Sequence, residues 1–426
     1  MTGKRTSYVS RRTVLKGGAA ALAAPALFSG SAFSARPIKI GYVTPATGPL
    51  ASFSESNAFI LDQLQKATGG IIQNNGKRYE IQVITKDTQS NASRASDVAA
   101  ELILKDKIDL LVTGGAPDTV NPAADQAELN EVPCISTANP WQPYFFGRKG
   151  DPKKGFNWTY HFCFGLEDIH AAFIDLWSKT DTNKVVGGVF ANDPDGNAWG
   201  QALPPALQKV GFKTIDPGRY QPLTNDFSAQ ISAFKSGSAE IVTGTMLPPD
   251  FSTFWAQCAQ QNFKPKVVTV GKAFLTPTSA AALGDRAEGL SCEVAWHPAF
   301  PFKSGWTGQS CAQVYDEYNK SRGRQGSFGI GLLYSMFEVA VDVLKRTKSV
   351  EDPKAILQAI TETQYQSLVG PVDWKSNKGP VKNVCKTPIV AGQWERKTAG
   401  GPLTLAIKAN AANKDIPVDG TLKLLS

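Results

Sequence analysis

The chain has 426 residues, 42% of them hydrophobic, and a formal net charge of +8 at pH 7. Five basic residues fall within the first 16 positions with no acidic residue beside them, so the rest of the chain carries a formal charge of only +3. This weak positive balance argues against nucleic-acid binding. About 390 residues follow the basic start, more than one hydrophobic core usually organises, so we expect two domains.

The N-terminus has the pattern of an export signal. The segment SRRTVLK, which contains Arg11 and Arg12, precedes a charge-free apolar run over residues 17–28. That run is too short to span a bilayer, and the arginine pair is similar to a twin-arginine export signal. The alternative is a disordered basic tail. Small residues near position 35 suit cleavage, so we expect residues 1–35 to be a signal peptide and the remainder to be periplasmic.

The cysteines bear on anchoring and on metal binding. None precedes Cys134, so no residue near the expected cleavage site can carry a lipid. No CxxC pair occurs, which argues against a zinc site or a thioredoxin-like centre. An oxidising compartment permits disulfides, but their pairing stays open. The cysteines concerned are Cys134, Cys163, Cys258, Cys292, Cys311 and Cys385.

Strands and helices alternate along the first part of the chain beyond the leader. Short β-rich runs are each followed by a loop and, in three cases, by an amphipathic stretch. This order is typical of a parallel, doubly wound sheet. The expected strands are 38–43, 79–85, 110–113 and 134–136, and the expected helices are 54–66, 95–105 and 120–130.

A second series of the same kind begins near residue 181, which predicts a second α/β lobe. Its expected strands are 185–190, a short one near 214, 241–243 and 267–270, with helices over 198–210, 227–235 and 252–261. Helical stretches over 307–320, 332–346 and 353–360 are too many for this lobe alone, so some must return to the first lobe. The fold class is therefore α/β, with two doubly wound parallel-sheet lobes.

The residues give little support for an enzyme. The three histidines, His161, His170 and His297, form no HExxH pattern, and the chain has no GxSxG, GxGxxG or GxxxxGK[ST] motif. We interpret His161 and His297 as structural. The acidic run 192–197 lacks the spacing of a calcium loop and fits a turn before a helix. A secreted hydrolase with a pair of carboxylates stays a remote alternative.

Four segments carry a resemblance to a known family. TPATGPLASF, KDTQSNASRA, NDFSAQISAFKSGSAEIV and GPVDWKSNKG occur in this order between about residues 38 and 394. Together they resemble the leucine/isoleucine/valine type of periplasmic binding protein. The resemblance implies two lobes joined by three chain crossings, near residues 160–164, 292–297 and 368–374. Lobe one would comprise 36–160 and 297–370, and lobe two 161–296 and 371–426.

The resemblance also implies a function. It indicates the non-enzymatic substrate-binding component of an ABC-type importer, which closes by a hinge on a small organic solute of the amino acid, amide or carboxylate class. The expected partners are this ligand and a transporter permease, with a monomeric protein and no cofactor, metal or nucleic acid. A ligand-binding sensor on the same fold is the alternative.

Ligands bind outside the carboxyl ends of parallel strands, where both lobes offer loops to a shared cleft. The resemblance implies aromatic walls, a hydroxyl or carboxylate after the third strand, and backbone and side-chain contacts after the fourth. There Pro140 replaces the family's hydroxyl residue, so Asn139 or Thr137 would supply the polar contact. The residues expected in the site are Phe53, Asp118, Thr119, Ala138, Asn139, Trp141, Trp199 and Lys272.

Lys272 bears on the class of ligand. Relatives that bind amino acids hold the ligand ammonium with a carboxylate in the corresponding loop, residues 270–273, which contains no acid here. A lysine at the cleft would attract a carboxylate. We therefore expect a carboxylate without a free α-amine, with an apolar body and with branched-chain amino acids as the runner-up. The alternative is that Lys272 is a solvated loop residue.

Overall fold

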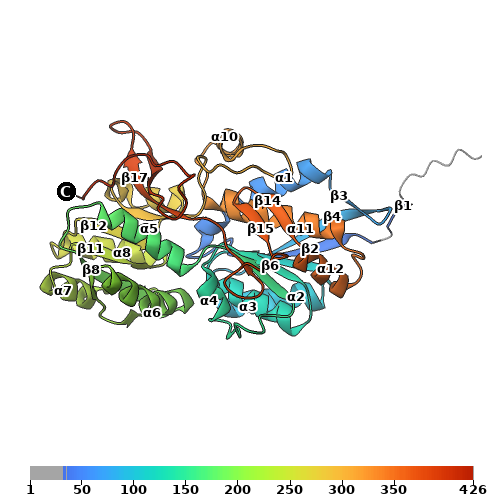
Figure 1. Cartoon of the computed structure of the whole chain (residues 1–426), viewed down its shortest axis with the longest axis horizontal. Helices are drawn as coiled ribbons and strands as arrows, with labels where there is room; N and C mark the ends of the chain where they lie inside the picture. Colours follow the sequence, from blue (N-terminus) through green and yellow to red (C-terminus); the bar gives the residue numbers. More distant parts are fainter. Residues whose placement is uncertain (1–31, 35, 426) are drawn as a thin grey trace, which may run out of the picture.

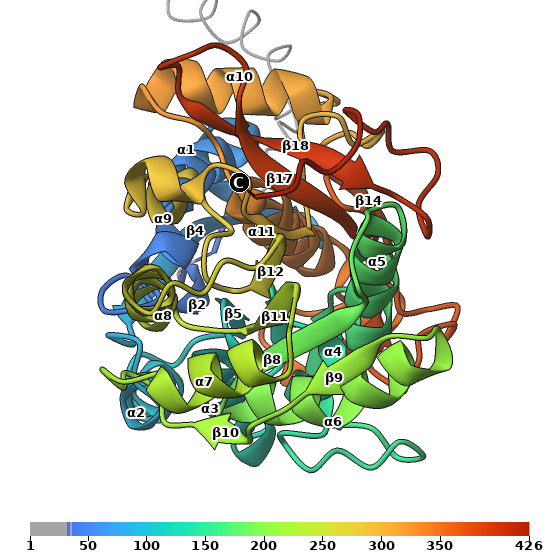
Figure 2. The ribbon, with the colours of Figure 1, turned by 90° about the vertical axis from the view of Figure 1, so that its left-hand side faces the viewer.

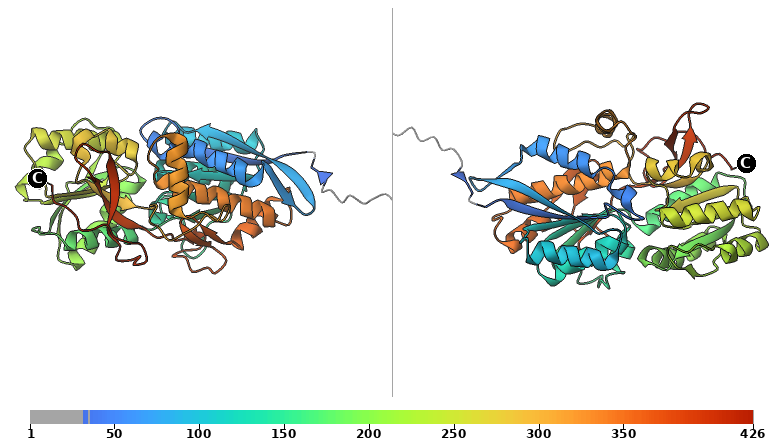
Figure 3. Two further views of the ribbon diagram at one scale, coloured as in Figure 1. Left: turned by 90° about the horizontal axis from the view of Figure 1, so that it is seen from above. Right: turned by 180° about the vertical axis from the view of Figure 1, so that it is seen from behind.

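The computed structural model describes residues 32–34 and 36–425 and consists of two α/β lobes side by side (Figures 1 and 3). Arg11, Arg12 and the apolar run 17–28 lie outside the described residues. Within the described part of the chain, no helix has the length and hydropathy needed to cross a bilayer.

Lobe one is built on a sheet with the order β1-β4-β2-β5-β6-β7-β16, parallel along this path, with β3 antiparallel to β4. The central strand β2 is buried along almost its whole length, as expected for a strand covered on both faces. The bounds are β1 Ala32–Phe33, β2 Ile38–Thr44, β3 Ile71–Asn74, β4 Lys77–Asp87, β5 Leu110–Gly114, β6 Cys134–Thr137, β7 Thr159–Phe162 and β16 Val384–Cys385.

Helices cover both faces of this sheet. One face packs against α1 and α11 and the other against α2 and α3 (Figure 1). Nearly every residue of α11 is buried, so it forms the centre of the lobe-one core. The bounds are η1 Ala51–Ser54, α1 Asn57–Thr68, α2 Ala92–Leu104, α3 Pro117–Leu129, α4 Trp141–Phe145, α10 Cys311–Arg322, α11 Phe328–Arg346 and α12 Pro353–Thr361, with a hairpin of β14 Gln364–Ser367 and β15 Gly370–Asp373.

Lobe two has the strand order β10-β8-β11-β12-β13-β17-β18, with β9 beside β8 (Figure 2). The strands up to β13 are parallel, whereas β17 and β18 add an antiparallel edge. The strands are β8 Val185–Ala191, β9 Lys213–Ile215, β10 Arg219–Tyr220, β11 Ile241–Thr245, β12 Val267–Gly271, β13 Ser291–Val294, β17 Val390–Arg396 and β18 Leu403–Ala409. The helices are α5 Leu166–Ser178, α6 Pro194–Lys209, α7 Ser228–Ser236, α8 Pro248–Gln260, α9 Pro277–Ala281 and η2 Gly284–Ala287.

Both predicted series of strands are present, and the predicted fold class is confirmed. The chain leaves the first sheet after β7, at Phe162, and leaves the second after β13, at Val294. The third passage differs from the prediction of residues 368–374. Strand β16 pairs with β7 in the first sheet, so the chain reaches the second sheet only between Cys385 and Val390.

All six cysteines are buried, and none forms a disulfide within residues 32–34 and 36–425. Burial raises the pKa of Cys134 and Cys163, which keeps both thiols protonated at neutral pH. The cysteines therefore act as small apolar side chains of the core.

Candidate functional site

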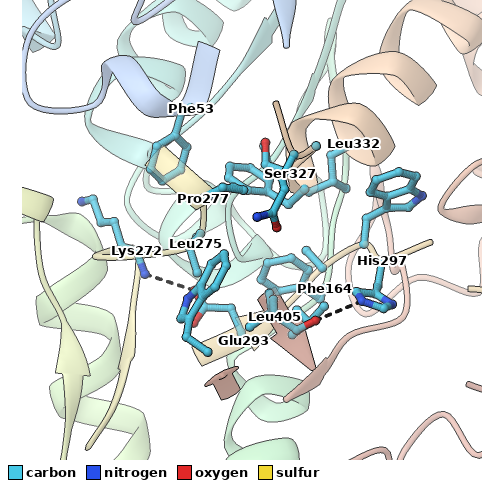
Figure 4. A pocket seen from close by; sticks show the side chains of 18 of the residues that line it. Phe53, Phe164, Lys272, Leu275, Pro277, Glu293, His297, Ser327, Leu332 and Leu405 are labelled. Carbon is cyan, nitrogen blue, oxygen red and sulfur yellow. Dashed lines mark hydrogen bonds between the residues drawn. The ribbon is translucent and has the colours of Figure 1, made fainter. Parts of the chain in front are cut away.

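A cavity of about 280 Å³ lies between the two lobes. Segments that follow β5 and β6 line it from lobe one, and the end of β11 and segments that follow β8, β12 and β13 line it from lobe two. Figure 4 shows some of the lining side chains, among them Phe53 of lobe one and Lys272 and Glu293 of lobe two. These are the carboxyl ends of parallel strands, where doubly wound sheets bind their ligands. The sequence of each lobe thus builds half of one site.

Two of the lining turns have left-handed backbones at residues other than glycine. Ala138, directly after β6, has φ of 72°, and Lys272, directly after β12, has φ of 68°. Such conformations cost energy for a residue with a Cβ and persist where the surroundings hold them. Both residues line the cavity.

Aromatic side chains line the cavity from both lobes. Phe53 of η1 meets Phe328 of α11 edge to face with ring centroids 5.1 Å apart. On lobe two, Trp199 of α6 lies against His170 and Phe173 of α5. Phe164, Leu275, Trp296 and Leu332 are among the further apolar residues of the lining. The cavity therefore suits a ligand with an apolar body.

Glu293 of β13 places a carboxylate among the apolar residues of the lining. Its Oε1 accepts the backbone N–H of Lys272 at 3.2 Å, the bond dashed in Figure 4, and its buried Oε2 has no hydrogen-bond partner. Burial raises the pKa of Glu293 to about 7. A Cβ on Gly271 would come within 3.0 Å of Oε1 and 3.1 Å of the Trp199 ring, so the glycine leaves room for both.

Lys272 lies inside a group of three carboxylates. Its Nζ is 2.8 Å from Asp118 Oδ2, 3.2 Å from Asp193 Oδ2 and 3.3 Å from Asp195 Oδ2. Its side chain is only 5% exposed. Burial lowers the pKa of Lys272, but the carboxylates outweigh this and raise it well above the usual value. The alternative of a solvated lysine is therefore wrong.

Asp193 and Asp195 have different parts in this group. Asp193 is the N-cap of α6, since its Oδ1 accepts the N–H of Gly196 at 2.7 Å, which confirms the interpretation of residues 192–197 as a turn before a helix. Asp195 lines the cavity, and its Oδ1 is buried without a hydrogen-bond partner. Burial raises the pKa of Asp195 to about 7.

The structure brings five of the eight predicted site residues to the cavity: Phe53, Ala138, Asn139, Trp199 and Lys272. Both side-chain polar atoms of Asn139 are buried without a hydrogen-bond partner. Thr137, the other candidate for a polar contact, instead donates its hydroxyl to the Phe162 carbonyl at 2.7 Å.

The other three lie outside the lining. Asp118 pairs with Lys272. The Thr119 hydroxyl donates to the Ala116 carbonyl at 3.3 Å, within the first turn of α3. Trp141 packs against two phenylalanines and donates its indole N–H to Glu167 at 3.2 Å. These partners belong to the protein, so Thr119 and Trp141 have structural surroundings here.

The sequence did not lead to Glu293 or Asp195 as residues that line the cavity. Glu293 is the single charged residue in the apolar segment LSCEVAWH. An isolated acid in such a strand indicates a buried carboxylate, and this signal was available.

The histidines have structural environments. Both ring nitrogens of His161 are hydrogen-bonded, to Ser136 Oγ and the Asn139 carbonyl, and burial lowers its pKa to about 3. His297 lines the cavity, accepts the Ala299 N–H and bonds to the Leu405 carbonyl. Burial also lowers its pKa, so the ring is neutral at pH 7.

The lobes touch across the cavity. Thr278 donates to Glu55 at 2.7 Å, Ser279 donates to Ser52 at 3.0 Å, and Gln325 donates to the Leu403 carbonyl at 2.9 Å. Each of these contacts joins a segment of lobe one to a segment of lobe two. These contacts hold the two lobes together over the cavity.

Comparisons with known proteins agree with this architecture. A family described as periplasmic binding protein matches residues 37–399. A Brucella abortus protein named Leu/Ile/Val-binding protein homolog 7 is 21% identical over 82% of this chain and 86% of its own length.

Solved structures match as well. The leucine-binding protein LivK of Thermotoga maritima has a TM-score of 0.71 and 19% identity, over 87% of this chain and 98% of its own. A solute-binding protein of an ABC transporter from Rhodopseudomonas palustris BisB5, in complex with 3,4-dihydroxybenzoic acid, has a TM-score of 0.69 and 21% identity, over 88% and 96%. With the family match over most of its length, the chain belongs to the periplasmic binding proteins, which bind solutes and are not enzymes.

Proposed function

We propose that this protein is the periplasmic substrate-binding component of an ABC-type importer, and that its ligand is a small organic solute with a protonated amine and an apolar body. The observation that carries the ligand class is the buried, unpartnered Oε2 of Glu293 beside the aromatic wall of Trp199. The names of the matched proteins, a Leu/Ile/Val-binding homologue and a leucine-binding protein, support an amino-acid-like solute.

The charges around the cavity favour a cationic group. The Lys272 ammonium forms ion pairs with Asp118, Asp193 and Asp195. It therefore has no positive charge left unpaired to bind a ligand carboxylate. Glu293 adds a further carboxylate. A ligand ammonium would balance this excess and form charge-assisted hydrogen bonds with the free oxygens of Glu293 and Asp195. The surroundings of Lys272 thus argue against the expected carboxylate without an α-amine.

The remaining polar groups suit the rest of such a solute. The unpartnered amide of Asn139 carries an NH2 group with two N–H donors and a carbonyl acceptor on lobe one, and Ser327 lines the same cavity. The apolar body would lie between Phe53 and Trp199, which face it from opposite lobes. Closure would then bury the solute and present the closed surface to the permease.

The ligand class can be tested by proton linkage. Trp199 and Gly271, which lie beside the Glu293 carboxylate, belong to the same lobe as Glu293, and burial raises the pKa of Glu293 to about 7. A ligand ammonium lowers this pKa, so binding near pH 7 releases protons. Affinity is then greatest above pH 7 and weakens as the pH falls through 7. Burial also raises the pKa of Asp195 to about 7 and that of the more distant Asp250 to about 6, so both carboxyls add to the proton exchange, whereas Lys272 stays protonated near pH 7.

Calorimetry in buffers of different ionisation enthalpy measures this release. We expect leucine or a related amine-bearing solute to bind with proton release and 4-methylpentanoate, which lacks the amine, to give no response. Tight binding of the desamino acid with proton uptake would contradict the proposal and restore the carboxylate class. A thermal-shift screen of amino acids, amides and aromatic acids identifies the ligand for this experiment.

Export is the second part of the proposal and concerns residues outside the described structure. Changing both Arg11 and Arg12 to lysine is expected to leave precursor in the cytoplasm, because the twin-arginine pathway recognises the pair as an address. Fractionation and immunoblotting measure the distribution. Normal periplasmic accumulation of the double variant would contradict a twin-arginine signal.

A further inference from the structure

Asp118 and Lys272 form an ion pair that spans the cleft. Asp118 lies in the first turn of α3 in lobe one, and Lys272 follows β12 in lobe two. Their side chains meet at 2.8 Å, with exposed fractions of 23% and 5%. The other contacts between the rims described above join hydroxyl and amide groups to single acceptors, so this pair is the strongest electrostatic contact among them.

Lobe two holds the lysine in position independently of lobe one. Asp193, fixed as the N-cap of α6, and Asp195 both contact the Lys272 ammonium, and Glu293 accepts its backbone N–H. When the lobes part, the ammonium keeps these two carboxylates and loses only Asp118. The lysine therefore does not have to be ordered again each time the lobes close.

From this geometry we propose that the Asp118–Lys272 pair is a latch that stabilises the closed form before ligand binds, so that Asp118 sets affinity without touching the ligand. The proposal rests on the hinge closure in the proposed function. Apparent affinity falls in proportion to the fraction of protein in the competent, closed form. Asp118 does not line the cavity, so its replacement removes no side chain from the lining.

The test measures closure in the absence of ligand. Ser93 of α2 and Ala229 of α7 are exposed positions on lobes one and two, and the native cysteines are buried, so Ser93→Cys and Ala229→Cys can be labelled selectively. Spin labels there report the distance between the lobes by pulsed dipolar spectroscopy. We expect Asp118→Asn to lower the ratio of closed to open protein about tenfold, the effect of losing a hydrogen bond between charged groups.

Asp125→Asn is the matched control. Asp125 lies on the same helix and also pairs with a basic residue, Arg148, at 2.7 Å, but within lobe one. The Asp125→Asn variant changes the net charge by the same amount and should leave the ratio of closed to open protein unchanged. A ratio in Asp118→Asn equal to that of the parent, or an equal fall in Asp125→Asn, would overturn the latch. Thermal melting of both variants separates loss of closure from loss of folding. Because no ligand is used, the result does not depend on the proposed ligand class.

Discussion

Replacing Glu293 with glutamine is expected to weaken binding of an amine-bearing ligand by roughly ten- to hundredfold, the contribution of a hydrogen bond to a charged group. Glutamine retains an acceptor for the Lys272 N–H, which Oε1 now accepts at 3.2 Å, so the turn after β12 keeps its contact. The variant loses only the negative charge that would face the ligand. Calorimetry with the ligand found by screening measures the change in Kd.

Glu338→Gln provides a matched control. Glu338 of α11 is also a buried glutamate whose pKa burial raises to about 7, and one of its oxygens likewise has no partner. It accepts hydrogen bonds from Ser304 and Trp306 instead of lining the cavity. We expect its replacement to leave Kd unchanged. The proton release on binding should also decrease in Glu293→Gln and persist unchanged in Glu338→Gln. Equal affinity of the Glu293 variant and the parent would show that this carboxylate does not hold the ligand.

Much of the fold was predictable because strand and helix patterns are local. The buried strand β2 and the amphipathic helix α2 follow directly from apolar spacing in the sequence. Strand β16 was not predictable in this way. It consists of two residues, and it is a strand only because β7, more than 200 positions earlier, offers it a free edge. That pairing moves the third crossing and lengthens the chain that belongs to lobe one.

The family resemblance led to Phe53 and Trp199, which line the cavity, and the remaining part of the site was predictable where residues directly follow strands. This rule found Ala138, Asn139 and Lys272, which come after β6 and β12. It missed Glu293 because that residue lies within β13, and its exposure to the cavity depends on Gly271 of the neighbouring strand. The ion pairs of Lys272 could not be predicted from local sequence patterns either, because Asp118 and Asp193 lie 154 and 79 positions away in the chain.

Gly196→Ala is expected to destabilise lobe two by about 3 kcal/mol or more, the range of severe overpacking. A Cβ at this position would lie 2.0 Å from the Ala191 carbonyl oxygen and 2.5 Å from its nitrogen. Both atoms are backbone at the end of β8, so the clash can be relieved only by moving α6 away from the sheet. That movement would also displace Asp195 and Trp199, which the first turns of α6 bring to the cavity.

Thermal melting and the ligand Kd measure the two consequences together. Gly329→Ala is the control, because Gly329 also lies in the first turn of a helix, and the nearest atom to its Cβ would be Ser56 Oγ at an ordinary 3.5 Å. There the alanine should raise stability by about 0.5 kcal/mol, since glycine is the poorer helix former. A Gly196 variant that melts like the parent would mean that α6 can shift freely against β8. The positions of Asp195 and Trp199 would then have to be fixed by their partners, Lys272 and Phe173, instead of by the contact between helix and strand.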